Sequence, residues 1–145
     1  MIAEKFIDKK PVTLILGDNL FYGDNFSNQL KRCIDETRGA TIFSYLVNNP
    51  ERYGVVEFDE HKKAINIIEK PKEPKTSYAI TGIYFYDGSV VEKVKRLTPS
   101  SRVELEITDL NLMYLKENNL NVEVLCKGTA WLDTGTFNSL HQASE

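Results

Sequence analysis

Hydrophobic residues are grouped along the chain in short runs that are rich in β-branched and aromatic side chains. The first is VTLIL, residues 12–16, a continuous apolar run typical of a buried strand. Charged or proline-containing segments separate it from later runs of similar length. The pattern predicts strands at 12–16, 40–47, 53–59, 64–70, 79–86 and 121–127, of which the third and fourth form a hairpin.

Between the strands, apolar residues recur at three- and four-residue spacing, the period of an amphipathic helix. The first such segment begins after Asp24 or Asn25, either of which is a suitable N-cap, and it ends at Gly39. Further helices are predicted after Asp87, over 105–116 and after Thr136, and residues 1–10 have the pattern of the end of a helix. In chain order, the expected inner faces are Ile2, Phe6 and Ile7; Phe26, Leu30, Cys33, Ile34 and Thr37; Val90, Val91, Val94 and Leu97; and Ile107, Leu110, Met113 and Tyr114.

The first strand, the first helix and the second strand make a strand–helix–strand unit. Such a crossover implies parallel strands and a right-handed connection. Strands and helices alternate through the rest of the chain, which indicates the α/β class. In a parallel sheet, ligands bind at the carboxyl ends of the strands, so polar residues at those positions are the first candidates for a functional site.

Composition narrows the classes of protein without naming one. A chain of 145 residues corresponds to one domain, and 41% hydrophobic and 27% charged residues are ordinary for a globular protein. The formal net charge of −3 argues against a nucleic-acid-binding protein with a basic surface. The two cysteines, Cys33 and Cys126, lack metal-site spacing and are expected as buried free thiols. With no membrane-spanning run and no signal peptide visible, we expect a cytoplasmic protein that binds no membrane.

Two aspartates follow predicted strands directly. Asp18 lies in LGDN after the first strand, and Asp133 lies in LDTG near the end of the chain. Carboxylates from two strand ends suit Mg²⁺, which prefers a few carboxylates together with water and substrate phosphates. The alternative is that each aspartate only caps a turn. Asp-Thr-Gly also occurs in aspartic proteases, but those enzymes are all-β.

Glu69 and Lys70 end the second strand of the hairpin, and Pro71 then turns the chain away. Because neighbouring strand residues point to opposite faces, the two are not expected to pair, and one of them would face a ligand. The alternative is a solvated strand end.

Trp131 is either a core aromatic or a stacking platform, and a tyrosine of the run 84–86 would border a sugar. The other candidate nucleophiles and bases, His61, His141, Ser27 and Ser139, lack the context of a catalytic pair.

Six segments in order, LILGDN, ERYGVVEFD, IIEKP, AITGIYFYD, ELEITDLN and AWLDTG, resemble the sugar-1-phosphate nucleotidyltransferases over essentially the whole chain. Within that family the resemblance is closest to the enzymes that couple dTTP to glucose 1-phosphate, giving dTDP-glucose and pyrophosphate for dTDP-rhamnose synthesis. It implies a three-layer α/β/α fold with a Rossmann-like mixed sheet. It also implies in-line attack of the sugar phosphate on the α-phosphorus, without a covalent protein nucleophile.

The resemblance also assigns roles to individual residues. Asp18 and Asp133 would hold Mg²⁺, and together with Lys70 they would form the catalytic set, with Lys70 on the phosphate. The sugar side would be formed by Asn19, Tyr53, Gly54, Glu69, Ile80 and Glu104. Gly54 would leave room for a sugar, and Ile80 would offer backbone groups to it.

Three features depart from the family pattern. The Gly-rich loop that cradles the triphosphate, with its Arg, is absent, and so are the last helices, so we expect an incomplete domain with an exposed apolar surface and sheet edges. Val103 stands where close relatives have glycine, which puts the loop before Glu104 in doubt. Full-length members tend to be homo-oligomers. The alternative function is a non-catalytic sugar-phosphate-binding or regulatory module of the same fold.

Overall fold

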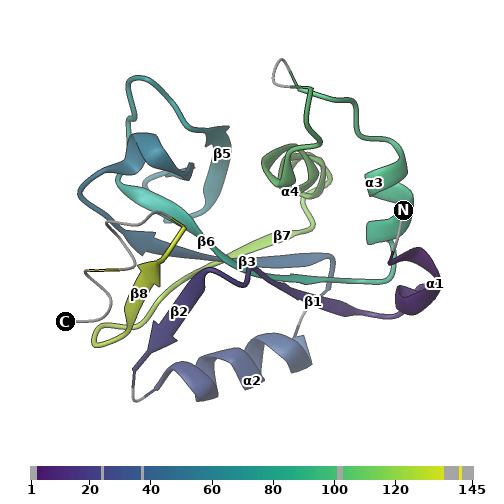
Figure 1. Ribbon diagram of the computed structural model, residues 1–145, viewed down its shortest axis with the longest axis horizontal. Coiled ribbons are helices and arrows are strands. Elements are labelled where there is room, and N and C mark those ends of the chain that lie inside the picture. Colours follow the sequence, from purple (N-terminus) through teal and green to yellow (C-terminus); the bar gives the residue numbers. More distant parts are fainter. Residues whose placement is uncertain (1–2, 24, 37, 101–102, 136–140, 142–145) are drawn as a thin grey trace.

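The computed structural model describes residues 3–23, 25–36, 38–100, 103–135 and 141 (Figure 1). Its helices are α1 (Glu4–Ile7), α2 (Phe26–Glu36), α3 (Val90–Lys95) and α4 (Ile107–Lys116), with a 3-10 turn η1 (Pro50–Arg52). Its strands are β1 (Val12–Ile15), β2 (Asn19–Tyr22), β3 (Ala40–Leu46), β4 (Gly54–Phe58), β5 (Ala64–Glu69), β6 (Tyr78–Tyr86), β7 (Leu120–Val124) and β8 (Ala130–Asp133).

The main sheet is mixed. Its strand order is β5-β4-β6-β3-β7, and β1 also pairs with β6. Among the described strands, β3 and β7 pair in parallel, and the other pairings in this sheet are antiparallel. β1 and β3 are both antiparallel to β6, so they run in the same direction, as the strand–helix–strand unit predicted. They are not neighbours, however, because β6 lies between them.

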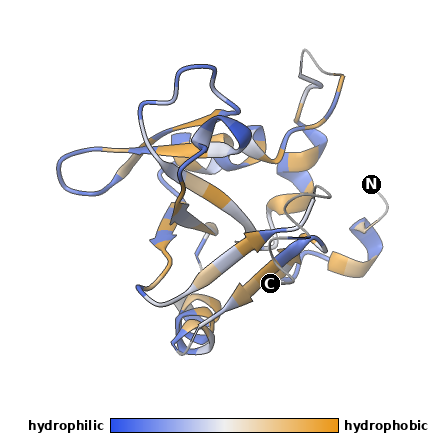
Figure 2. Cartoon of the chain, turned by 60° about the vertical axis from the view of Figure 1, so that its left-hand side comes forward, coloured by the Kyte–Doolittle hydropathy of each residue, from blue (hydrophilic) through white to orange (hydrophobic). Residues whose placement is uncertain are grey.

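Helices cover both faces of this sheet, which confirms the three-layer α/β/α architecture (Figure 1). On one face, α3 and α4 contribute Val90, Leu110 and Tyr114 to a core with Ile42 and Tyr86. On the other face, α2 contributes Cys33 to a second core, together with sheet residues such as Phe43 and Phe85. The strands carry most of the hydrophobic residues and the connecting loops are mainly hydrophilic (Figure 2).

Several predicted inner positions are exposed. Residues 12–16 are not a buried strand, because Leu14, Ile15 and Leu16 are exposed, Ile15 by 59%. Among the described strands β1 pairs only with β6, and apolar sequence alone cannot fix whether a partner covers its faces. Phe6 and Ile34 are also exposed, which corrects the predicted inner faces of α1 and α2. The expected exposed apolar surface is therefore present.

Two strands were not predicted from the sequence pattern. β2 and β8 form a separate two-stranded antiparallel sheet, in which Asn19 lies opposite Asp133 and Phe21 opposite Trp131. Each strand has four residues and is flanked by turn-forming sequence, Gly-Asp before β2 and Thr-Gly after β8, which hides the period of two. This small sheet brings the LGDN and LDTG segments together.

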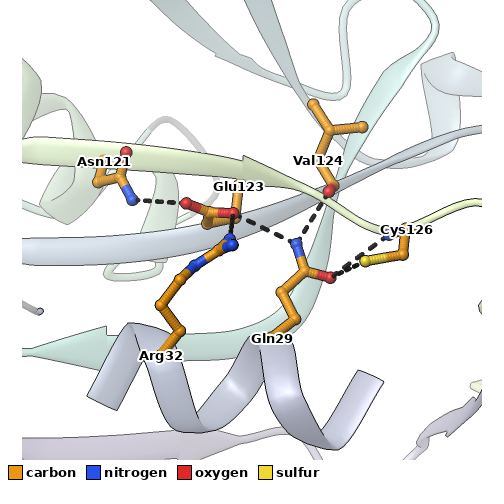
Figure 3. Close-up of polar contacts among 6 residues, drawn as sticks. All are labelled: Gln29, Arg32, Asn121, Glu123, Val124 and Cys126. Carbon is orange, nitrogen blue, oxygen red and sulfur yellow. Dashed lines mark hydrogen bonds and ion pairs between the residues drawn. The ribbon is translucent and has the colours of Figure 1, made fainter. Parts of the chain in front are cut away.

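A polar cluster fixes α2 against the end of β7 (Figure 3). The buried Gln29 donates from Nε2 to the carbonyl oxygen of Val124 at 3.0 Å and accepts at Oε1 from the backbone N–H and the thiol of Cys126, at 3.3 and 3.0 Å. Arg32 pairs with Glu123 at 2.7 Å. Because α2 follows β2 and Cys126 precedes β8, these contacts also support the small sheet. Cys126 is only partly buried, which corrects the expectation of a fully buried thiol, and neither Cys33 nor Cys126 forms a disulfide.

Within the described part of the chain, no helix has the length and hydropathy needed to cross a membrane. Some sequence predictions fall on residues outside that part. These are the Asp24 cap, the positions of Ile2 and Thr37, and the last helix with its Thr136 cap. Gly39, three residues after the last residue of α2, has a φ of 83°, a left-handed conformation that glycine adopts readily.

Candidate functional site

A cleft of about 230 Å³ forms where β1 ends and β4 begins along the same edge of β6. The N–H of Leu16 donates to the carbonyl oxygen of Gly82 at 2.9 Å, which is the last contact of β1 with β6. β4 joins the same edge a few residues away, where Val55 pairs with Ala79. Between these two partners the edge of β6 has no strand beside it in the described structure, and the cleft opens there.

Most residues assigned from the sequence meet in this cleft. Its lining includes Asp18, Asn19, Tyr53, Gly54, Glu69, Lys70, Ile80 and Asp133. Glu104 is not brought together with them: it is exposed and lies outside the lining. The residues of the ELEIT segment that reach the cleft are Ile107 and Thr108, in the first turn of α4.

The two aspartates direct their carboxylates at one point. The backbone N–H of Thr134 donates to the carbonyl oxygen of Asp18 at 2.7 Å, so the LGDN and LDTG turns are joined directly. A Cβ atom built on Gly135 would lie 2.9 Å from Oδ2 of Asp18 and 3.1 Å from Oδ1 of Asp133. The described residues contain no group of three or more His, Cys, Asp or Glu that could hold a metal. Two convergent carboxylates fit a hard cation that takes its other ligands from water or phosphate.

Glu69 and Lys70 both line the cleft, which corrects the expectation that they point to opposite faces. Lys70 has a φ of 41°, so it leaves the strand conformation and the alternation of faces no longer applies to it. Its Nζ lies 4.0 Å from Oε1 of Glu69. On its other oxygen, Glu69 accepts a hydrogen bond from the hydroxyl of Thr108. A left-handed lysine is strained, and such strain is typical of functional sites.

Gly54 has a second reason to lack a side chain. A Cβ atom there would lie 3.1 Å from both Oε2 of Glu69 and Oγ1 of Thr108. That spacing is tighter than most real Cβ contacts. Gly54 therefore permits the Glu69–Thr108 hydrogen bond, beside any room that it leaves for a ligand.

Two tyrosines of the cleft are held in the neutral form. Burial raises the pKa of Tyr84 well above its ordinary value, and the charges of Glu69 and Asp18 raise it further. Burial also raises the pKa of Tyr53; the charge of Arg52 opposes this, and the charge of Asp133 and a hydrogen bond to it add to the rise. Both phenols are therefore hydrogen-bond donors at neutral pH, beside carboxylates that accept.

Sequence reasoning missed part of the lining. Thr108 lies in the first turn of α4, next to the segment that was assigned to Glu104. Ile80, Gly82 and Tyr84 alternate along β6 and all line the cleft, so Tyr84 is the tyrosine of the run 84–86 that borders it, whereas Gly82 was not assigned from the sequence. Trp131 is 8% exposed and its ring lies 5.2 Å from that of Tyr53, so it is a core aromatic that also lines the cleft. Arg52 and Leu16 complete the rim, and no sequence signal marked them.

Comparison with known proteins shows the family of the chain. A sequence model of the family described as Nucleotidyl transferase matches residues 1–145. The glucose-1-phosphate thymidylyltransferase of Neisseria meningitidis serogroup A is 55% identical over 144 residues, which cover 99% of this chain and 50% of that protein. The Mycobacterium tuberculosis protein of the same name is 48% identical over 145 residues, 100% of this chain and 50% of its own length. The chain thus spans about half the length of the curated relatives it matches.

Solved structures show the same relationship. A Bacillus anthracis protein described as a glucose-1-phosphate thymidylyltransferase, in complex with sucrose, has a TM-score of 0.86 and 42% identity, over 98% of this chain and 56% of that one. A UDP-glucose pyrophosphorylase complexed with UDP-glucose has a TM-score of 0.84 over 98% of this chain and 57% of that one; at 21% identity this is a likeness of fold alone. The family model matches the full length of the chain, and the relatives described above are about half identical to it. The chain therefore belongs to the nucleotidyl transferase family.

Proposed function

We propose that this chain carries the sugar-phosphate-binding and metal-binding portion of a glucose-1-phosphate thymidylyltransferase. The reaction would transfer a deoxythymidylyl group from dTTP to glucose 1-phosphate, giving dTDP-glucose and pyrophosphate for dTDP-rhamnose synthesis. The observation that carries the proposal is the convergence of Asp18 and Asp133 in one cleft with Glu69 and Lys70. The choice of dTTP and glucose rests on the names of the relatives.

The charges in the cleft suit the two ends of a sugar phosphate. Lys70 would place its ammonium group against the phosphate as a point charge. Glu69, oriented by Thr108, would accept hydrogen bonds from sugar hydroxyls. The volume of about 230 Å³ is below the roughly 300–1,000 Å³ of sites for drug-sized ligands, which favours a ligand of monosaccharide size.

In the proposed reaction, a phosphate oxygen of glucose 1-phosphate forms a bond to the α-phosphorus of dTTP, and the bond from that phosphorus to pyrophosphate breaks. Asp18 and Asp133 would hold Mg²⁺, which supplies charge neutralisation for the phosphates. Glu69 and Lys70 would orient the attacking sugar phosphate, and Trp131 and Ile107 would limit the access of water. The residues thus contribute positioning and electrostatics and need no covalent nucleophile.

Calorimetry with glucose 1-phosphate, with and without Mg²⁺, tests the binding part of the proposal. We expect binding by the chain and a loss of the Mg²⁺ contribution in Asp18→Asn and Asp133→Asn, with Asp35→Asn on the exposed face of α2 as the matched control. The proposal fails if both site variants bind ligand and metal as the parent chain does. Pyrophosphate release on adding dTTP, measured for this chain and for a full-length relative, tests the chemistry.

A second candidate is a sugar-phosphate-binding module without catalysis, since the chain spans about half of its relatives. Binding of glucose 1-phosphate without pyrophosphate release would favour it. We further propose that the protein acts in the cytoplasm, in keeping with two cysteines that form no disulfide, and that the complete protein forms a homo-oligomer.

A further inference from the structure

The side-chain amide of Asn19 has only one orientation that its neighbours allow. The indole N–H of Trp131 lies 2.6 Å from Oδ1 of Asn19, and the backbone N–H of Gly82 lies 2.9 Å from the same atom. Both neighbours are donors only, so the atom between them must be the carbonyl oxygen. A flipped amide would place its NH₂ group against two donors and its oxygen against a carboxylate.

In that orientation, the amide nitrogen of Asn19 faces the carboxylate of Asp18. The Nδ2 of Asn19 donates to Oδ1 of Asp18 at 2.9 Å, which engages one oxygen of the carboxylate. The other oxygen, Oδ2, is the one that lies 2.9 Å from the Cβ position of Gly135, next to Oδ1 of Asp133. The hydrogen bond therefore fixes the rotation of the Asp18 carboxylate and leaves the oxygen on the Asp133 side for another partner.

Gly82 contributes by lacking a side chain. A Cβ atom there would lie 2.6 Å from Cγ and Oδ1 of Asn19, closer than atoms can approach. The amide of Asn19 therefore packs directly on the backbone of β6. The short β2–β8 sheet completes the arrangement, because Asn19 lies opposite Asp133 in its register and Trp131 is on the same strand as Asp133. In an antiparallel pair these three side chains share one face.

We infer that Asn19 is a positioning residue for the proposed cation site and that Trp131 and Gly82 hold it in place. The amide nitrogen of Asn19 has two N–H donors and gives one of them to Asp18, so the sequence-based assignment of Asn19 as a substrate-binding residue stays a prediction beside this role. The inference rests on the proposed function, which places a divalent cation between Asp18 and Asp133. Partners of this kind, one step removed from the metal, typically change metal affinity about 10–100-fold when they are removed.

Titration of the metal-free chain with Mn²⁺ alone, followed by electron paramagnetic resonance, tests the inference. Asn19→Leu keeps the volume and removes the hydrogen bonds, and we expect about tenfold weaker Mn²⁺ binding or more. Trp131→Phe keeps an aromatic ring but removes the N–H together with part of the indole ring system, and we expect a smaller loss, on the order of three- to tenfold. Because both act through one amide, the double variant should bind no more weakly than Asn19→Leu. Asn48→Leu, on the exposed loop after β3, is the matched control.

The alternative role of Asn19 gives the opposite result. If Asn19 contacts only the substrate and does not position Asp18, Asn19→Leu retains Mn²⁺ affinity and loses affinity for glucose 1-phosphate measured without metal, which overturns the inference. Additive effects of the two substitutions on Mn²⁺ affinity also overturn it. Circular dichroism checks that each variant is folded; if Asn19→Leu is not, Asn19→Ser and Trp131→Phe take its place.

The same titration separates the inference from the proposed function. If the parent chain binds Mn²⁺ no better than Asp18→Asn does, there is no cation site at Asp18, and both the proposed function and the inference are wrong. If the parent chain binds Mn²⁺ through Asp18 and Asn19→Leu binds it with the same affinity, the inference about Asn19 is wrong. The proposed function is not contradicted by that result.

Discussion

Asp18 and Asp133, near opposite ends of the chain, direct carboxylate oxygens at the same point beside Gly135. Oδ2 of Asp18 and Oδ1 of Asp133 lie 2.9 and 3.1 Å from the position of a Cβ atom at that glycine. The β2–β8 pairing and the hydrogen bond from the Thr134 N–H to the Asp18 carbonyl hold the two turns together. Backbone contacts thus bring the two aspartates together beside Gly135.

Gly135→Ala should fill this space with a methyl group. We expect divalent-cation affinity to fall about tenfold or more, as is typical when groups around a metal site are displaced. Gly135 is exposed, so the free energy of unfolding should change little. Mn²⁺ titration and urea denaturation measure the two quantities. Gly17→Ala is the control, because a Cβ atom there meets nothing within 4 Å. Equal cation affinity in the two variants would contradict a cation position beside Gly135.

Lys70→Met should weaken the binding of glucose 1-phosphate while keeping the length of the side chain. A hydrogen bond to a charged group contributes about 1.5–3 kcal/mol when well placed. The Lys70 side chain is half exposed, so screening by solvent reduces this, and we expect about a tenfold loss of affinity. Calorimetry at low and high salt measures it, and the difference from the parent chain should shrink at high salt. Lys72→Met, on the exposed loop two residues later, should bind like the parent.

Val103→Gly should stabilise the chain. Val103 has a φ of 61°, a left-handed conformation that is unfavourable for β-branched residues, and its side chain is 84% exposed, so no packing is lost. Relief of a strain of about 1–2 kcal/mol exceeds the extra entropy of glycine in the unfolded chain. We expect a net gain of about 0.5–1 kcal/mol in urea denaturation. Val103→Asn should act in the same direction, and Val103→Ile should give no gain.

Gln29→Leu should loosen the attachment of α2 to β7 (Figure 3). The substitution keeps the volume but leaves the Val124 carbonyl oxygen and the Cys126 N–H without their partner. An unsatisfied buried group costs about 1–3 kcal/mol, and the free energy of unfolding should fall by that order. Denaturation in urea measures the loss. Asn28→Leu, at an exposed position one residue earlier, is the control and should lose much less.

Alkaline pH should destabilise the fold through its buried tyrosines. Burial raises the pKa of Tyr84 and Tyr86 above the ordinary value of 10.0. A group with a raised folded-state pKa contributes stability that is complete below its unfolded pKa and is lost as the pH rises above it. The free energy of unfolding should therefore fall above pH 10, by up to about 1.4 kcal/mol per pH unit for each tyrosine.

Tyr84→Phe should reduce the steepness of that fall in urea denaturation at a series of alkaline pH values. Tyr22→Phe is the control: its ring is 80% exposed, and the substitution should leave the slope unchanged. An identical slope in Tyr84→Phe and the parent chain would show that the buried phenol of Tyr84 is not part of the alkaline transition.

Much of the fold follows from local pattern. The hairpin, the buried strand β3, the strand β6 and the inner positions Val90, Leu110 and Tyr114 were predicted because apolar period and breaker residues are local properties. Among the charged members of the cleft, Asp18, Glu69, Lys70 and Asp133 were predictable from their places at strand ends, whereas the other assigned members came from the family resemblance. Burial of β1 was predicted wrongly, because apolar sequence does not say which surface a partner covers.

The sequence by itself determined the class of fold and the identity of the acids, the lysine and the glycines. Tertiary structure decided how these residues come together in the cleft. β2 and β8 are too short to be recognised alone, and only their pairing places Asn19 opposite Asp133. The left-handed turn at Lys70 brings two neighbouring charges to one face, and the donors on Asn19 come from Trp131 and Gly82, far along the chain. Hydrogen bonds between distant segments depend on packing geometry, which no local pattern encodes.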